Sequence, residues 1–197
     1  MLGSRFCIAK SMISFRCCMV TASCKTRRAS GRSSAVMAKA AAKSFGPCTS
    51  WDEALLPARA LGIMLQSHEV QGPKDFAAAF SMIAEERPDA LLVLQDAVTM
   101  QQRNEIIDFA RQKRLPSMFQ EKGWAVAGGL MSYGENLPSM YRRAAYFVDR
   151  IFHGVKPADL PVEQATKFDM ILNLRTAKAI GLTIPDSILV LADEVIE

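Results

Sequence analysis

Asp96 is the residue of this chain whose type and position best fit the binding of a charged ligand. It follows the apolar run at residues 90–94, which is typical of a β-strand covered on both faces. A carboxylate at the end of such a strand can point into a crevice and hold an ammonium group through a charge-assisted hydrogen bond. Aspartate is also a favoured N-cap, and a helix is expected to begin near Val98. Both roles stay open, and one residue can perform both.

A second group of candidate residues lies in the segment GGLMSYG, residues 128–134. The glycine pair at its start allows a close approach of the backbone, and the next residues are typical of a short strand. Tyr133 would then place an aromatic ring and a hydroxyl at a strand end that faces a cleft, as aromatic side chains often do in ligand pockets. A half-buried strand aromatic is an equally open interpretation of this residue.

The sequence lacks the residue patterns of common enzyme classes. It contains no dinucleotide fingerprint GxGxxG, no phosphate loop GxxxxGK followed by Ser or Thr, and no nucleophile elbow GxSxG. Its two histidines, His68 and His153, are far apart, and all five cysteines precede Trp51 without CxxC spacing. We therefore expect no catalytic residue, no metal site and no cofactor, and we predict that the protein is not an enzyme.

Charge divides the chain near residue 51. Residues 1–51 hold nine lysines and arginines and no acidic side chain, whereas the rest holds 15 basic and 20 acidic side chains. Because a folded part with excess acid is a poor match for phosphate, we expect no nucleic-acid partner. Residues 1–51 are expected to be a basic leader that is disordered or not homologous to the remainder.

The leader does not contain a convincing signal peptide. Its arginine- and serine-rich composition fits a transit-like segment, but Lys10 and Arg16 interrupt the apolar run that a secretory signal needs. A leader without any address is the other interpretation. No run of 18 apolar residues occurs in the sequence, so we expect no membrane-spanning helix.

Hydrophobic periodicity after residue 52 predicts alternating strands and helices. The expected strands are 63–70, 90–95, 115–120 and 168–174, and the expected helices are 75–87, 98–114, 138–154, 175–181 and a proline-started helix at 183–197. Short strand–helix–strand connections favour right-handed crossovers and a parallel sheet. Ligands meet such sheets at the carboxyl ends of the strands, where Gln95, Asp96, Phe119 and Gln120 are expected.

Several stretches of the sequence carry a resemblance to a known family. They are DALLVLQD, LPSMF, GGLMSYGENL, YRRAAYFVDRIFHG and the long C-terminal stretch from ADLPVEQATKFDMILNL to ADEVIE. From about residue 52 onward, the chain resembles the C-terminal part of ABC-transporter substrate-binding proteins, in the family that includes tryptophan- and tyrosine-binding members. Such proteins resemble type I periplasmic binding proteins, in which two Rossmann-like lobes joined by a hinge close over a solute.

The resemblance implies an α/β fold in which helices flank a Rossmann-like parallel sheet. Residues 52–127 and 160–197 would form the second lobe of a binding protein. Residues 128–159 would form the hinge and a helix of the first lobe.

The resemblance also implies ligand-binding roles for five residues. Asp96 would face the cleft and hold a ligand amine, with Gln95 and Phe119 on the same rim. Ser132 and Tyr133, in the hinge, would lie near the ligand.

By this resemblance, the chain is expected to be the substrate-binding component of an ABC-type importer. It would capture a small solute in the interlobe cleft, with an amino acid as one candidate. Its partner would be an ABC permease and its location periplasmic or otherwise extracytoplasmic. The residues that would build the first lobe are not recognisable, so a truncated protein is expected. Two alternatives are an intracellular small-molecule sensor domain and a flavodoxin-like α/β enzyme, although the phosphate-binding loop of such an enzyme is absent.

Overall fold

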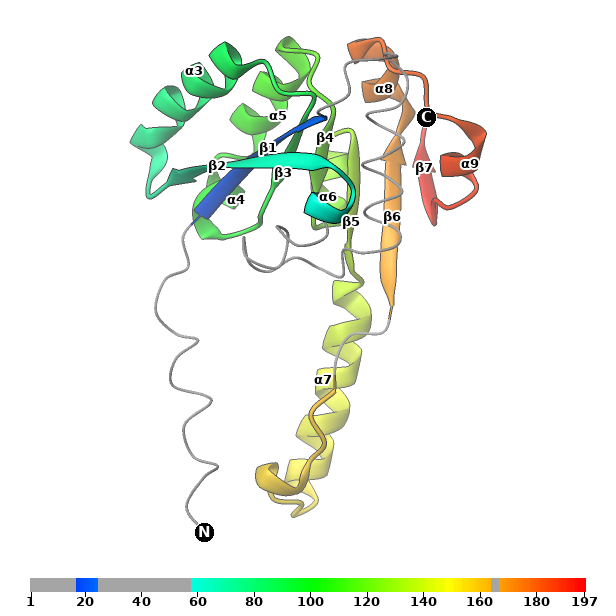
Figure 1. Cartoon of the computed structure of the whole chain (residues 1–197). Helices are drawn as coiled ribbons and strands as arrows, with labels where there is room; N and C mark the ends of the chain where they lie inside the picture. The colour runs from blue at the N-terminus through cyan, green and yellow to red at the C-terminus, as the bar shows by residue number, and fades with distance from the viewer. Residues whose placement is uncertain (1–16, 25–57, 164–166) are drawn as a thin grey trace.

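The computed structural model describes residues 17–24, 58–163 and 167–197 of the chain. These residues build one seven-stranded sheet in the order β2-β1-β3-β4-β5-β6-β7 (Figure 1). The strands are β1 (Cys17–Cys24), β2 (Ile63–Val70), β3 (Ala90–Val93), β4 (Ser117–Phe119), β5 (Met131–Glu135), β6 (Phe168–Asn173) and β7 (Glu194–Ile196). The helices are α3 (Phe76–Glu86), α4 (Ala97–Gln101), α5 (Arg103–Gln112), α6 (Lys122–Val126), α7 (Leu137–Phe152), α8 (Leu174–Ile180) and α9 (Asp186–Leu189), with 3-10 turns η1 (Pro73–Asp75) and η2 (Pro157–Asp159).

The part of the sheet from β3 to β7 is mostly parallel. Three of its four pairings are parallel, and β5 with β6 is the antiparallel exception. This arrangement confirms the predicted α/β fold with flanking helices. Because β3, β4 and β5 run in the same direction, their carboxyl ends lie at one edge of the sheet. Strand β6 runs the opposite way and therefore begins at that same edge.

Strand β1 separates β2 from β3. It pairs antiparallel with both of them, so β2 and β3 run in the same direction, as a crossover through α3 requires. A parallel sheet was expected here, yet a strand that runs antiparallel to both lies between them. That strand belongs to residues 1–51, the segment expected as a separate leader. The other residues of the expected leader, and its boundary at residue 52, lie outside the described residues.

Two hydrophobic clusters cover the two faces of the sheet. Alternate residues of β3 divide between them, since successive side chains of a strand point to opposite faces. Leu91 and Val93 pack with residues of α3, α5 and α6 on one face. Leu92, and Leu94 directly after the strand, pack with residues of α8 and α9 on the other. All four residues of β3 are buried, which agrees with a strand covered on both sides.

The C-terminal segment differs from its predicted structure. A single helix was expected at 183–197, but α9 spans only four residues and the chain then forms β7. The reason is a long-range pairing with the outer edge of β6. Asp193 donates its backbone N–H to the Met170 carbonyl oxygen at 2.8 Å, and its Oδ2 accepts the Met170 N–H at 2.8 Å. These bonds pair backbone groups of β6 that a terminal helix would leave without partners.

Helix α7 extends away from the sheet (Figure 1). It begins at Leu137 with the Asn136 side chain as N-cap, because Asn136 Oδ1 accepts the Ser139 N–H at 2.9 Å. None of its 16 residues is buried, although its sequence has the apolar stripe of a helix that packs against other structure.

Candidate functional site

A cavity of about 330 Å³ lies at the sheet edge where β4 and β5 end and β6 begins. It continues to the first residue of β7 and to the start of α7. Seven charged side chains line it: Glu121, Lys122, Glu135, Lys167, Asp169, Asp193 and Glu194. Five carboxylates therefore face two lysines, and the lining carries a net negative charge.

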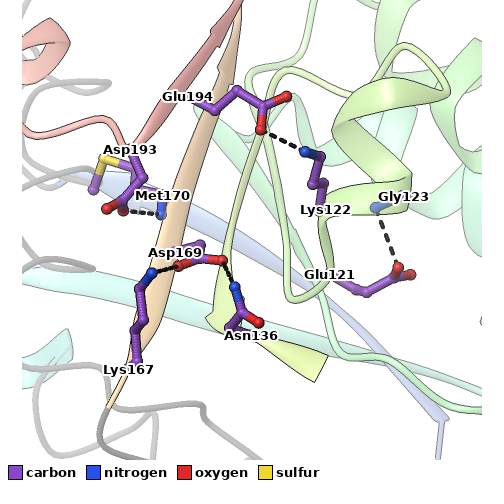
Figure 2. Close-up of polar contacts among 9 residues, drawn as sticks. All are labelled: Glu121, Lys122, Gly123, Asn136, Lys167, Asp169, Met170, Asp193 and Glu194. Carbon is purple, nitrogen blue, oxygen red and sulfur yellow. Dashed lines mark hydrogen bonds and ion pairs between the residues drawn. The ribbon is translucent and has the colours of Figure 1, made fainter. Parts of the chain in front are cut away.

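Asp169 is at the centre of the polar contacts in the cavity wall. Its Oδ2 accepts a hydrogen bond of 2.5 Å from the Asn136 Nδ2, and its Oδ1 lies 3.7 Å from the Lys167 Nζ (Figure 2). The distance to Lys167 is an ion-pair distance and too long for a hydrogen bond. These contacts join the first residues of β6 to the residue that caps α7, across the antiparallel pairing of β5 and β6.

Most other charges of the wall are also occupied by protein partners. Lys122 pairs with Glu194, and Asp193 accepts the Met170 N–H (Figure 2). Glu121 caps α6 through a 3.3 Å bond from the Gly123 N–H. These four side chains shape the wall and have less capacity left for a ligand.

Glu135 is the exception among the carboxylates of the cavity. Its side chain forms no hydrogen bond or ion pair with any of the described residues, and it is half-buried at the end of β5. A partly desolvated carboxylate without a cation gains more from an incoming cation than an exposed one does. Glu135 is therefore the wall residue best placed to bind a positively charged group.

The backbones of β4 and β5 approach each other closely beside the cavity. A Cβ atom at Gly134 would lie 1.8 Å from the carbonyl oxygen of Gln120, so only glycine fits there. Gln120 also reaches back toward β3, where its Oε1 accepts the Gln95 N–H at 2.9 Å. This link connects the cavity to the carboxyl end of β3.

Asp96 acts as the N-cap of α4, which is one of the two roles left open for it by the sequence. Its Oδ1 accepts the Thr99 N–H at 2.8 Å, and the Thr99 Oγ1 accepts the Asp96 N–H at 2.9 Å. The bonds to the carboxylate use Oδ1, and Oδ2 forms no hydrogen bond with the described residues. Asp96 is half-buried at the same sheet edge as the cavity, but it does not line the cavity.

Phe119 and Ser132 have side chains in the protein interior. They are register partners on β4 and β5, and both are fully buried. The Phe119 ring stacks on Trp124 with ring centroids 4.6 Å apart. The Ser132 hydroxyl has no hydrogen-bond partner among the described residues. Their backbones reach the predicted edge, whereas their side chains do not line the cavity.

Tyr133 lies on the opposite face of β5 from Ser132. It is half-buried, packs against the cluster that contains α8 and α9, and its ring centroid lies 6.0 Å from that of Phe168. Gln95 is half-buried at the end of β3, and its Oε1 lacks a partner among the described residues. The five predicted site residues thus surround the sheet edge, and none of them lines the cavity.

Gln120, expected at the ligand-binding edge, does line the cavity, but the lining residues of β5 and β6 were missed because they come together only through the pairing of these two strands. Asn136 and Asp169 are 33 positions apart in the sequence. One signal was available: the polar residues at the end of the GGLMSYGEN segment and the KFD triplet at the start of the next apolar strand both mark strand ends. An antiparallel pairing of these strands would have predicted their contact.

The described part of the chain contains no group of three or more His, Cys, Asp or Glu side chains placed to hold a metal ion. His68 is not part of such a group. It lies buried on β2, with its Nε2 3.1 Å from the Glu86 Oε2. Within the same residues, no helix has the length and apolar character needed to cross a membrane.

The fold defines a class of protein through its similarity to three solved structures. A conserved domain protein from Vibrio cholerae is 26% identical with a TM-score of 0.68, over 73% of this chain and 48% of that one. An ABC domain in complex with L-Trp from Streptococcus pneumoniae is 22% identical with a TM-score of 0.68, over 74% and 49%. A ligand-free, open substrate-binding protein with adhesive properties from Clostridium difficile is 20% identical with a TM-score of 0.56, over 74% and 48%. The chain spans about half the length of each of these proteins.

The sequence identifies the family within this class. Residues 49–196 match the model of the ABC transporter substrate binding protein family, and the chain belongs to that family. This result confirms the resemblance noted in the sequence. A comparison with curated proteins finds no match. Because the family consists of transport proteins and not of enzymes, it also confirms the predicted non-enzymatic class and disfavours the flavodoxin-like alternative.

Proposed function

We propose that this chain is the solute-binding part of an ABC-type importer and that the cavity beside Glu135 holds part of the solute. The observation that carries the proposal is the position of the cavity at the carboxyl ends of β4 and β5, in a member of this transport family. Open α/β sheets bind ligands at this edge. The cavity volume of about 330 Å³ is at the small end of the range for ligand pockets, about 300–1,000 Å³.

The solute carries an ammonium group in this proposal, and an amino acid is the favoured class. Glu135 supplies a carboxylate that pairs with no cation of the described residues, and the surrounding wall is negative overall. Asp96 Oδ2, which accepts no hydrogen bond from the described residues, supplies a second acceptor at the same edge. Support for an aromatic amino acid comes from the Streptococcus pneumoniae relative, whose structure contains L-Trp. Gln95, Phe119, Ser132 and Tyr133 would then support the binding edge.

A complete interlobe cleft requires residues beyond those of the described fold. We propose that residues 52–127 and 160–197 correspond to the second lobe and residues 128–159 to the hinge and one helix of the first lobe. The half-length match to three binding proteins supports this division. An ABC permease as partner and an extracytoplasmic location belong to the same proposal.

Ligand-dependent thermal unfolding of the full chain tests the proposed chemistry. L-tryptophan is compared with tryptamine, which lacks the carboxylate, and with indole-3-propionate, which lacks the amine. A ligand that binds only the folded state raises the unfolding midpoint by mass action. We expect both amines to raise the midpoint and the acid to leave it unchanged. A rise of the midpoint with indole-3-propionate would contradict the proposal. So would the absence of a rise with L-tryptophan and tryptamine.

Glu135→Gln removes the proposed anchor while keeping the shape of the side chain. A hydrogen bond to a charged group contributes about 1.5–3 kcal/mol, so amine affinity is expected to fall by roughly tenfold or more in titration calorimetry. Glu85→Gln is the matched control, because Glu85 is exposed on α3 and far from the cavity. Equal losses in both variants would exclude a specific role of Glu135.

Two substitutions separate the capping role of Asp96 from its proposed ligand role. Asp96→Asn keeps a good N-cap but removes the charge, so the unfolding free energy should change little while amine affinity falls. Asp96→Ala removes both and is expected to lower the unfolding free energy by about 1 kcal/mol. Unchanged affinity in Asp96→Asn would leave the cap as the function of this residue.

A further inference from the structure

We propose that the family-matched part of this chain contains a strand-sized slot between β2 and β3 and that residues 17–24 fill it as a donor strand. The slot is an interaction surface for an extended segment with an apolar side chain at one fixed position. In the intact chain the occupant is β1, which lies outside the matched residues 49–196.

The path of the chain creates the slot. Strand β2 is followed by α3 and then by β3, and the two strands run in the same direction without pairing with each other. Their facing edges would each present a row of unpaired N–H and C=O groups if nothing lay between them. Every residue of β3 is buried, so water is a poor substitute for a strand there.

The pairing of β1 matches this slot closely. Its eight residues pair with all eight residues of β2, from Ile63 to Val70, and four of them pair with β3. A strand that pairs on both edges must donate hydrogen bonds in both directions, which proline prevents. Residues 17–24 contain no proline and no charged residue.

Met19 fixes the position of the strand in the slot. Its side chain is 0% exposed and belongs to the cluster that joins α3 and α5 to the sheet. Val70 and Val93 are members of the same cluster, and they come from the two strands on either side. Because side chains alternate across a strand, a shift of one residue would turn Met19 to the other face and leave its place in the core empty.

The backbone supplies most of the recognition in this arrangement. Strand addition obtains affinity from main-chain hydrogen bonds and specificity from pockets for alternate side chains. A peptide of residues 17–24 should therefore bind the slot in trans once the native β1 is prevented from occupying it.

Hydrogen exchange of the full-length wild-type chain is the first test. We expect backbone amides of residues 18–23 to be protected to within about tenfold of those of Leu91–Val93, because amides in one cooperative unit open together. Exchange of residues 18–23 at the rate of an unstructured chain, with Leu91–Val93 still protected, would overturn the proposal. This test depends on no variant and so does not depend on whether a variant folds.

Val20→Pro in the full chain is the second test, since Val20 pairs with both Ser67 and Leu92. We expect a lower unfolding midpoint and faster exchange at Leu91–Val93. A peptide of residues 17–24 with serine in place of its cysteines should restore the midpoint of this variant and leave that of the wild type unchanged. The same peptide carrying Met19→Lys should not restore it.

Two outcomes decide the second test. A Val20→Pro chain with the midpoint and exchange rates of the wild type would overturn the proposal. A Val20→Pro chain that does not fold, beside a Met19→Leu chain that does, would support the need for a strand in the slot.

Discussion

At the residue scale, Gly134 sets how closely two strand ends can approach beside the cavity. Its missing Cβ leaves room for the carbonyl oxygen of Gln120, which would otherwise be 1.8 Å away. The contact partner is backbone, so it cannot move aside as the end of a flexible side chain would. The same approach places Gln120 where its side chain accepts the Gln95 N–H, which ties the three parallel strand ends together.

Gly134→Ala is therefore expected to destabilise the fold. Overpacking commonly costs about 1–3 kcal/mol, and a clash with backbone places this variant at or above the upper end of that range. Chemical denaturation measures the loss. Gly72→Ala is the matched control, because Gly72 has an extended backbone and no atom within 4 Å of an added Cβ. Equal stability of the two variants would show that the strand ends are farther apart than described.

At the element scale, α7 is held to the connector that follows it by Arg143. The guanidinium Nε donates to Glu163 Oε2 at 2.6 Å, and its Nη2 pairs with the other oxygen. The same guanidinium lies over the rings of Tyr146 and Phe147, 4.1 and 5.1 Å from their centroids. The hydrogen bond with Arg143 lowers the pKa of Glu163, and the bond with Glu163 raises the pKa of Arg143.

The direction of the Glu163 pKa shift predicts a pH dependence. A carboxyl group whose pKa is lowered in the folded state stabilises that state above its ordinary pKa and ceases to do so as pH falls through the lowered value. The connector should thus stay attached to α7 at neutral pH and detach only in acid. NMR titration of the Glu163 carboxyl should show a midpoint below that of an ordinary glutamate. Arg143→Gln should return the midpoint to the ordinary range, whereas Arg142→Gln, which removes a neighbouring charge without that bond, should not.

At the scale of the whole molecule, α7 leaves a large apolar surface in contact with water. Its exposed residues include Met140, Tyr141, Tyr146, Val148, Ile151 and Phe152. Contiguous apolar patches of this kind mark sites of association in soluble proteins. None of the residues of α7 is buried, so this apolar surface is available for association.

Removing apolar groups from α7 should reduce self-association without weakening the fold. Tyr141 and Phe152 are 74% and 83% exposed, so replacing both with serine should change the unfolding free energy by less than about 0.5 kcal/mol per site. Sedimentation velocity over a range of concentrations should show less oligomer than in the wild type. Val190→Ser, at an equally exposed position remote from α7, should leave the distribution unchanged. Oligomer content that is the same in all three chains would contradict this role of α7.

Much of the local structure could be predicted from the sequence, because it depends on residues close together in the chain. The apolar run at 90–94 predicted a strand buried on both faces, and Asp96 before a helix predicted a cap. The helix expected at 98–114 was found as two helices with Gln102 at the junction. The family was also evident from the ordered motifs of the C-terminal part.

The sequence by itself determined the class of fold, the family and the sheet edge at which a ligand is expected, since periodicity and motif order are written in neighbouring residues. Only the tertiary structure decided which side chains meet there. Glu135, Asn136 and Asp169 come together through the pairing of β5 with β6, and β1 occupies its place through pairings with β2 and β3. Hydrogen bonds between backbones carry no residue identity, so the sequence alone left these pairings open.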